Sequence, residues 1–274
     1  MNKSIFESID KVFVINLKHD VERKKSVETQ FQKRKLPFEI IEAIGHEDSE
    51  VREMYKENRI KSFPPCFRCL KNNCDHENNF LSPKQVANFL SFKKIMEIIK
   101  EQKINHTMIF EDDFKFKIFH KKSFLHLEKF IKVNKLLDSK KPLLVRIGCH
   151  TVVGKKYYLK FFLLNKTSFI KDNINMANPC FLINYKFAKL FLENFNRIET
   201  TSDNFIHRIL VRKFDTVNYS MYPFPIKQLS YGNKNNYFKS TINPEKDSNF
   251  QFDNINKVTS RKEYNLLLSK WIND

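Results

Sequence analysis

Three consecutive carboxylates, Glu111, Asp112 and Asp113, directly follow a short apolar run at residues 107–110 (TMIF). The run predicts a buried strand, and side chains at the carboxyl end of such a strand lie in the crevice where open α/β sheets bind ligands. In an extended chain Glu111 and Asp113 point to one side and Asp112 to the other. Carboxylate oxygens suit Mn²⁺ or Mg²⁺, which would neutralise the charge of a bound diphosphate. The alternative is a solvated strand end without a metal.

A second group of metal-ligand residues, Cys66, Cys69, Cys74 and His76, falls within eleven residues. Three thiolates and an imidazole suit tetrahedral Zn²⁺. The surrounding residues 60–80 have few apolar side chains, so a bound metal would supply the order that packing does not. A site with four protein ligands is closed, which favours a structural zinc over a catalytic one. The alternative is three unligated cysteines and a solvated histidine.

The elements that would position these residues follow from the apolar pattern of the chain. Residues 12–17 (VFVINL) and 38–44 (FEIIEAI) have the pattern of strands, and the charged stretch 20–35 between them that of a helix. Strand, helix and strand in so short a stretch make a βαβ unit, which predicts a parallel sheet. Further strands are predicted at 107–110, 143–147 and 181–183, and helices at 82–102, 186–195, 202–212 and 263–271.

The helix at 82–102 has the clearest boundary. Ser82 fits the N-cap, Pro83 the first helical position and Gln85 the third, which is the pattern of a capping box. Residues 47–79 lack such a pattern and are predicted to be irregular, and residues 231–260, rich in Asn, Lys and Ser, are predicted to be loop-rich. We therefore expect a single α/β domain over residues 1–274, with the Cys/His segment at 60–80 as an insertion.

Composition narrows the function classes. With 49 basic and 31 acidic residues among 274, the net charge is +18, which would suit nucleic acid, an anionic membrane surface or phosphorylated substrates. A Lys-, Asn- and Ile-rich composition from AT-biased coding explains the same charge without any partner. Only four glycines are present and no GxGxxG or Walker A stretch occurs, so phosphate must be held by other means. The first residues lack the apolar region of a secretory signal, which predicts a cytoplasmic protein.

Several blocks of the sequence follow one another in the order known from one enzyme family. They are VINL at 14–17 with Arg23 six residues on, FEIIEAI at 38–44, the helix at 82–99, MIFEDD at 108–113, residues 178–191, Asp203, and Tyr222-Pro223 with Gln228. In this order they resemble the family 25 glycosyltransferases, which include bacterial lipopolysaccharide and lipooligosaccharide glycosyltransferases and the collagen galactosyltransferases. The resemblance implies a GT-A-like fold, with a mostly parallel sheet flanked by helices.

The resemblance also implies an activity. A nucleotide-sugar donor, expected to be a UDP-sugar, would give its sugar, most simply a galactose-type hexose, to a hydroxyl of a glycan or lipid-linked glycan acceptor, with inversion. A divalent metal, Mn²⁺ or Mg²⁺, is expected at the acidic triplet, with Glu111 and Asp113 as ligands. A lipid-linked acceptor would bring the basic protein to the inner face of an anionic membrane.

Roles for single residues follow from the same resemblance. Donor contacts are expected from Asn16, Leu17, Arg23, Ser91 and Asp112, and catalytic roles for Asp113 and for Asp203 as general base. Some of these residues also have an alternative explanation without function. Arg23 would be an exposed helix charge, Ser91 a surface helix serine and Asp203 an N-cap carboxylate.

The chain departs from the family pattern in the helix at 82–102. Ser91-Phe92 stands where the family has Ser-His, and Ala87-Asn88 where it has Gly-Cys. Phe92 falls on the apolar face of the helix, which predicts a core residue. These departures support an alternative, a catalytically inactive glycosyltransferase fold kept for binding. Another alternative, a basic nucleic-acid-binding protein with a zinc knuckle, leaves the strand-terminal acids unexplained, so no nucleic-acid partner is expected.

Overall fold

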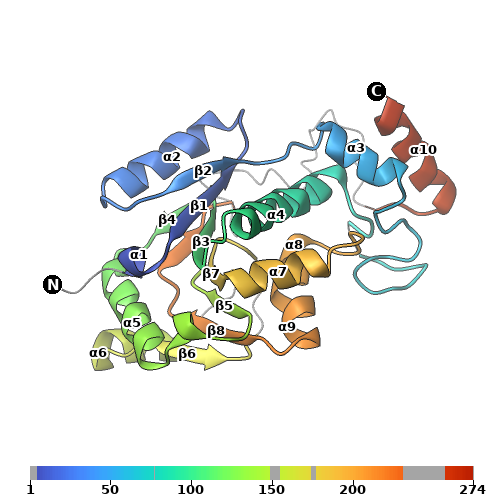
Figure 1. The fold of residues 1–274 in the computed structure, drawn as a ribbon. Helices are drawn as coiled ribbons and strands as arrows, with labels where there is room; N and C mark the ends of the chain where they lie inside the picture. The colour runs from blue at the N-terminus through green and yellow to red at the C-terminus, as the bar shows by residue number, and fades with distance from the viewer. Residues whose placement is uncertain (1–4, 77, 149–154, 174–176, 231–256, 274) are drawn as a thin grey trace.

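The computed structural model describes residues 5–76, 78–148, 155–173, 177–230 and 257–273 (Figure 1). A seven-stranded sheet forms the centre, in the order β2-β1-β3-β7-β5-β8-β6. Its strands are β1 (Lys11–Asn16), β2 (Glu39–Glu42), β3 (His106–Glu111), β5 (Leu143–Arg146), β6 (Ser168–Lys171), β7 (Cys180–Asn184) and β8 (Val217–Tyr222).

The sheet is mostly parallel. β1 pairs in parallel with both β2 and β3, and β5 pairs in parallel with β8. β7 runs antiparallel to β3 and β5, and β6 runs antiparallel to β8. The carboxyl ends of β1, β2, β3, β5 and β8 therefore meet at one edge. A second, two-stranded sheet of β4 (Phe114–Phe116) and β9 (Ile226–Gln228) adjoins that edge.

Helices cover both faces of the sheet (Figure 1). Side chains alternate along β1, so Phe13 and Ile15 join one apolar core and Val12 and Val14 the other. The first core contains side chains of α3 (Ser49–Lys56), α4 (Pro83–Glu101), α7 (Tyr185–Glu193) and α10 (Arg261–Asn273), together with Ile206 and Leu210, and the second contains side chains of α1 (Ile5–Ser8), α2 (Val21–Gln32) and α5 (His120–Val133). α6 (Lys155–Leu164) lies at the margin of the domain. None of the described helices combines the length and apolarity needed to cross a bilayer.

The α/β class, the βαβ start and the mostly parallel sheet were predicted correctly. The capping box is confirmed, because Ser82 Oγ accepts from the Gln85 amide at 3.4 Å and Gln85 Oε1 accepts from the Ser82 amide at 3.1 Å. Phe92 is fully buried in the core, as its helical position predicts.

Other predictions were wrong or incomplete. Residues 47–79 are not irregular throughout, because α3 buries Val51, Met54 and Tyr55. The helix expected at 202–212 is divided into α8 (Ser202–Asn204), a π-helical turn (Phe205–Ile209) and α9 (Leu210–Lys213). Of the predicted loop-rich segment 231–260, residues 231–256 lie outside the described part of the chain.

Candidate active site

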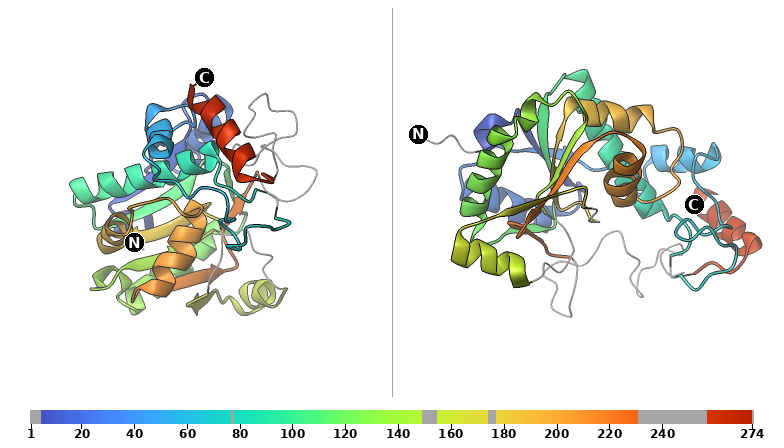
Figure 2. Two further views of the ribbon diagram at one scale, coloured as in Figure 1. Left: turned by 90° about the vertical axis from the view of Figure 1, so that its right-hand side faces the viewer. Right: turned by 90° about the horizontal axis from the view of Figure 1, so that it is seen from below.

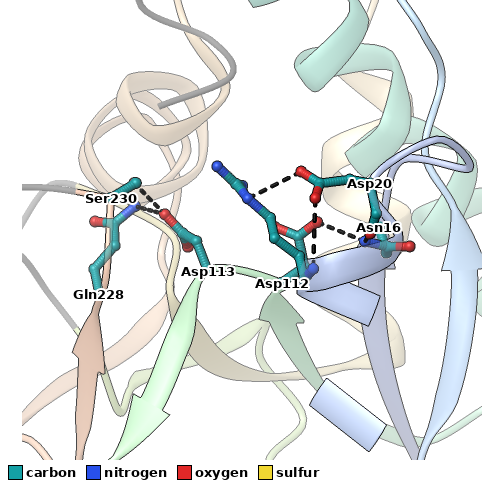
Figure 3. A network of polar contacts seen from close by, with 7 residues as sticks. Asn16, Asp20, Asp112, Asp113, Gln228 and Ser230 are labelled. Atoms are coloured by element: carbon teal, nitrogen blue, oxygen red, sulfur yellow. Dashed lines mark hydrogen bonds and ion pairs between the residues drawn. The ribbon is translucent and has the colours of Figure 1, made fainter. Parts of the chain in front are cut away.

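The acidic triplet lies where the parallel strands end. Glu111 is the last residue of β3 and pairs with Ile15 of β1, so Asn16 at the end of β1 lies beside the residues that follow Glu111. Asp112 and Asp113 point in opposite directions, Asp112 toward Asn16 and Asp20, and Asp113 toward Gln228 and Ser230 (Figure 3). The divergence expected from an extended chain is thus present, and it divides the site into two halves.

Asp112 forms one half with residues of β1 and α2. Its Oδ1 accepts from Arg23 Nη1 at 2.8 Å and its Oδ2 from Asn16 Nδ2 at 2.8 Å. Asp20, whose side chain caps α2, adds an ion pair to Arg23 Nε at 3.0 Å. Arg23 is only 6% exposed, so the alternative of an exposed helix charge is wrong. Burial raises the pKa of Asp112 to about 6, against the lowering effect of Arg23 and Asn16, and the carboxylate stays mostly ionised at neutral pH.

Asp113 forms the other half with the segment at the end of β9. Its Oδ2 accepts from Gln228 Nε2 at 3.1 Å and from the Ser230 hydroxyl. Its Oδ1 is buried and has no hydrogen-bond partner among the described residues, and the same holds for Gln228 Oε1. Buried acceptors without partners destabilise a protein, whereas hard cations bind such oxygens. The residues present therefore fit a divalent cation.

Glu111 adds a third carboxylate. Its pKa is raised well above the usual range, first by burial and then by the charges of Asp113, Asp112 and Asp203. In the part of the chain that the structure describes, no three carboxylates bring ligand atoms within 4.8 Å of one another. The three acids therefore do not form a closed ligand cluster, and a metal held there would need further ligands from other groups.

Asp203 lies close enough to Glu111 to act on its charge, although more than ninety residues separate them in the sequence. Thr201 is the N-cap of α8, so the alternative of Asp203 as an N-cap carboxylate is wrong. Asp203 Oδ1 accepts instead from the Asn204 amide at 2.8 Å and from the Thr201 hydroxyl at 2.5 Å. The role of Asp203 as general base stays a prediction.

Comparison with models of known protein families shows which family the chain belongs to. The model for glycosyltransferase family 25 (LPS biosynthesis protein) matches residues 9–206, more than half of the chain. The chain belongs to glycosyltransferase family 25. No curated protein matches it. The matched region contains the acidic triplet, the Cys/His cluster and Asp203, whereas Gln228 and Ser230 lie beyond it.

Two further residues expected at the donor in this family 25 glycosyltransferase, Ser91 and Leu17, form hydrogen bonds within the protein. Ser91 is only 2% exposed, so it is not a surface serine. Its hydroxyl donates to the Ala87 carbonyl at 2.8 Å and accepts from the Ile44 amide at 2.9 Å, which ties α4 to the end of β2. The hydroxyl thus supports the fold, and its expected contact with the donor stays a prediction. Leu17 follows β1, and its carbonyl accepts from the Asp20 amide at 2.9 Å at the start of α2.

A chain of hydrogen bonds runs along one face of the sheet from Arg146 of β5 to Glu111 of β3. Arg146 Nε donates to His207 Nδ1 at 3.1 Å, and His207 Nε2 lies 2.6 Å from Asn178 Oδ1. Asn178 donates to Ser202, Ser202 to Asn88, and Asn88 hydrogen-bonds to Glu111. Because a guanidinium can only donate, Arg146 fixes the direction of every later bond, and the chain ends on a carboxylate that can only accept.

His207 is the titratable link in this chain. Burial and the neighbouring Arg146 charge hold its pKa well below the usual range, so the imidazole is neutral. It lies in the π-helical turn, a distortion that often marks functional sites. The sequence analysis missed Arg146, Asn178 and His207. Asn88, a departure from the family pattern, is the one signal that the sequence gives for this chain of bonds.

The Cys/His residues also come together. Ligand atoms of Cys66, Cys69, Cys74 and His76 all lie within 4.8 Å of one another, with Cys66 Sγ and His76 Nδ1 4.0 Å apart. Burial raises the pKa of the Cys66 thiol, whereas the Lys71 amide lowers the pKa of Cys69 to about 7. The four residues named from the sequence are thus neighbours in space, in a region separate from the acidic triplet (Figure 2).

Proposed function

We propose that this family 25 glycosyltransferase moves a hexose, of the galactose type, from a UDP-sugar to a hydroxyl of a glycan or lipid-linked glycan, as in lipooligosaccharide assembly. The observation that carries the proposal is the pair of opposed aspartates at the sheet edge. Asp112 is ion-paired to Arg23, while Asp113 holds a buried oxygen without a partner among the described residues. Such an arrangement suits a charged, metal-assisted donor at the carboxyl ends of β1 and β3.

The donor would lie along these strand ends. Arg23 brings a positive charge to the site and fixes Asp112, and Asn16 holds the second oxygen of Asp112. The backbone at Leu17 would line the nucleotide side. Guanidinium groups suit diphosphates because their N–H groups match pairs of phosphate oxygens.

Mn²⁺ or Mg²⁺ would be held by Glu111 and Asp113, with Gln228 Oε1 as a further oxygen. The metal supplies neutralisation of the charge that develops on the leaving diphosphate. Two protein carboxylates leave coordination positions for donor phosphates. Binding of donor and metal would therefore depend on each other.

Asp203 is our candidate for the general base. Its carboxylate would accept the proton of the acceptor hydroxyl while that oxygen bonds to the anomeric carbon. The bond from this carbon to the diphosphate would break, and the UDP oxygen would leave with the electron pair. Attack from the face opposite the leaving group gives inversion. A base in hydrogen-bond reach of the attacking hydroxyl supports such a displacement.

The departure at Phe92 does not argue against catalysis. The ring is fully buried and packs against Phe181, with centroids 6.0 Å apart. Its position in the core keeps it out of the acidic edge. A cytoplasmic location, with a lipid-linked acceptor presented at the inner membrane face, fits the +18 charge.

The test is release of free nucleotide from a panel of UDP-, GDP- and CMP-sugars, with Mn²⁺ and with EDTA. We expect metal-dependent turnover of one donor, reduced roughly a hundredfold or more in Asp113→Asn. Asp215→Asn, an exposed aspartate ion-paired to Lys141, is the matched control and should keep full activity. Full activity of Asp113→Asn would refute the site. No turnover, together with no nucleotide binding by calorimetry, would instead favour an inactive binding protein.

A further inference from the structure

We propose that Cys66, Cys69, Cys74 and His76 bind one structural Zn²⁺. Among the described residues they are the one group of three or more metal-ligand side chains whose ligand atoms lie within 4.8 Å of one another. Zn–S bonds of about 2.3 Å in a tetrahedron place sulfur atoms about 3.8 Å apart. The observed spacing is slightly wider, so small side-chain movements would close it around an ion.

The backbone around Cys66 is arranged as for a thiolate. The Arg68 amide donates to Cys66 Sγ at 3.4 Å, and the Cys69 amide also hydrogen-bonds to this sulfur. Leu70, directly after Cys69, is left-handed with φ 64° although its side chain is large and 66% exposed. Such a conformation persists only where the surroundings enforce it. Two backbone hydrogen bonds of 2.9 Å hold this turn, from the Leu70 amide to the Cys66 carbonyl and from the Cys66 amide to the Lys71 carbonyl, and a metal bound by Cys66 and Cys69 would fix it further.

Packing does not provide that order. Between residues 68 and 78, none of the described side chains is buried, and no helix or strand is formed. The ligand residue Cys66 is the point where this loop meets the core, because it is itself fully buried. A closed zinc site would replace the missing apolar contacts, as in small metal-ordered modules.

The ordered loop would in turn support two other parts of the enzyme. The Asn79 side chain forms two hydrogen bonds with the Val258 backbone, at 2.9 and 3.2 Å, and Arg261 Nη1 donates to the Phe63 carbonyl at 2.8 Å. The Lys61 backbone amide donates to the Ile198 carbonyl at 2.8 Å, and Ile198 lies five residues before Asp203. Zinc would therefore help to hold α10 and the segment 198–203 in place.

Metal analysis of the full chain by mass spectrometry tests the proposal. We expect about one zinc per chain, lost in Cys69→Ser and kept in Cys180→Ala, a buried cysteine outside the cluster. Tryptic cleavage after Arg68 and Lys71 should become at least roughly tenfold faster when zinc is lost. Less than about a tenth of an equivalent of zinc in protein made and assayed with added Zn²⁺, another metal in its place, or full zinc content in Cys69→Ser would overturn the proposal.

A second inference rests on a different region, the outer face of α6. Its exposed large apolar side chains are Leu159, Phe162, Leu163 and Leu164, between 55% and 71% exposed, and Ile118 beside it is 96% exposed. The inner face is anchored by Phe161, whose ring lies 5.0 Å from that of Phe119. Exposure of this extent on one short helix is unusual for a surface that meets only water.

Charge indicates what covers this face. Lys155, Lys156 and Lys160 stand on the same helix, and residues 139–171 contain no acidic side chain. A helix with apolar side chains among lysines is typical of binding in the interface of an anionic membrane. A second copy of the chain would bring two lysine-rich faces together, which like-charge repulsion opposes.

We infer that α6 docks the enzyme on an anionic phospholipid bilayer, an inference that rests on the proposed lipid-linked acceptor. Tyr157 of α6 stacks on Tyr222 at 4.9 Å, and the chain continues from Tyr222 into β9 and Gln228, the partner of Asp113. The docking face is thus attached to the edge of the sheet that carries the acids. α6 lies at the opposite end of the molecule from α10 and the Cys/His loop (Figure 2).

Co-sedimentation with vesicles tests the docking face separately from catalysis. The chain should bind phosphatidylcholine vesicles containing phosphatidylglycerol, and bind pure phosphatidylcholine at least roughly tenfold more weakly. The double variant Leu159→Ser/Leu163→Ser should lose this binding, whereas Leu266→Ser, 69% exposed on α10, should keep it. Nucleotide release from a soluble donor should be equal in both variants. Equal binding to both vesicle types, or self-association by light scattering that the double variant abolishes, would overturn the inference.

Discussion

The acidic edge and the Cys/His loop are both candidate metal sites, but the fold builds them in opposite ways. The acids stand at the ends of paired strands, where the register of β1 with β3 sets Glu111 beside Ile15. Cys66 is buried at the start of a loop, and Cys69, Cys74 and His76 stand on residues 68–78, which form no helix or strand and bury no side chain where they are described. A metal at the first site would meet side chains that the sheet already holds in place, whereas the proposed zinc at the second would supply the order.

The two sites also differ in what remains unsatisfied. At the acidic edge, Asp113 Oδ1 has no hydrogen-bond partner among the described residues. Besides burial, the charges of Asp113, Asp112 and Asp203 also raise the pKa of Glu111. At the loop, backbone amides already hydrogen-bond to the sulfur of Cys66. A metal at the first site is therefore expected to exchange with substrate, and a metal at the second to stay with the protein.

The largest effect is expected from the loss of the proposed general base, Asp203, beside the acidic edge. Replacing Asp203 by Asn should lower kcat about 10²- to 10⁴-fold, because the acceptor hydroxyl loses its base. Donor KM and melting temperature should change little, since the amide can still accept from the Asn204 backbone as Asp203 does. Steady-state kinetics with Asp215→Asn as control measures this. An unchanged kcat would remove Asp203 from the mechanism and leave the base to another group.

Chelation tests whether the two candidate metal sites are independent of each other. EDTA should lower nucleotide release roughly a hundredfold at once, and Mn²⁺ should restore it, because open carboxylate sites bind metal weakly. Zinc content, measured in the same sample, should remain unchanged, since a closed Cys/His site holds its ion strongly. If zinc and activity disappear together and only zinc restores both, the two sites are not independent, and activity depends on zinc rather than on a metal at the acidic edge.

Local signals in the sequence predicted what local physics determines. The apolar run of β1, the capping box of α4 and the acids after β3 each depend on neighbours within a few residues, and each was found. Asp112 with Asn16 could also be inferred, because adjacent parallel strands end together. The partners of Asp113 could not, since Gln228 lies more than a hundred residues away on an added two-stranded sheet.

The chain of hydrogen bonds from Arg146 was beyond the sequence for the same reason. Its members come from β5, α4, the π-helical turn and the segments around them, and only the packed sheet brings them together. The amphipathic pattern of α3 was present at Val51, Met54 and Tyr55, yet it lies in a stretch whose prolines and cysteines indicated an irregular loop. Competing local signals therefore explain that error.

The pH dependence of stability tests whether His207, in the chain of hydrogen bonds that leads to Glu111, is buried in its neutral form. His207 has a depressed pKa in the folded protein, so only the unfolded chain binds its proton as the pH falls below about 6.5. Stability should therefore decrease toward acid, by up to about 1.4 kcal/mol per pH unit from this group. Urea unfolding between pH 7.5 and 5.5 measures the slope, which His207→Gln should reduce. The same slope in the variant would show that other groups dominate.

The smallest expected effect concerns Glu111, where function and stability oppose each other. Its raised pKa means that the folded state binds its proton more tightly than the unfolded state, so its contribution to stability falls as the pH rises above about 4.5. At neutral pH Glu111→Gln should therefore stabilise the metal-free enzyme, by about 1 kcal/mol or roughly 2–4 °C in melting temperature. Mn²⁺ should raise the melting temperature of the original chain more than that of the variant, because the cation relieves the same repulsion that the substitution removes.

Glu97→Gln, on the exposed side of α4 and ion-paired to Lys93, is the matched control and should show neither effect. A variant that is less stable without metal would mean that Glu111 is held by the hydrogen bond from Asn88 more strongly than it is repelled by its acidic neighbours, and the acidic edge would then be a structural site like the Cys/His loop.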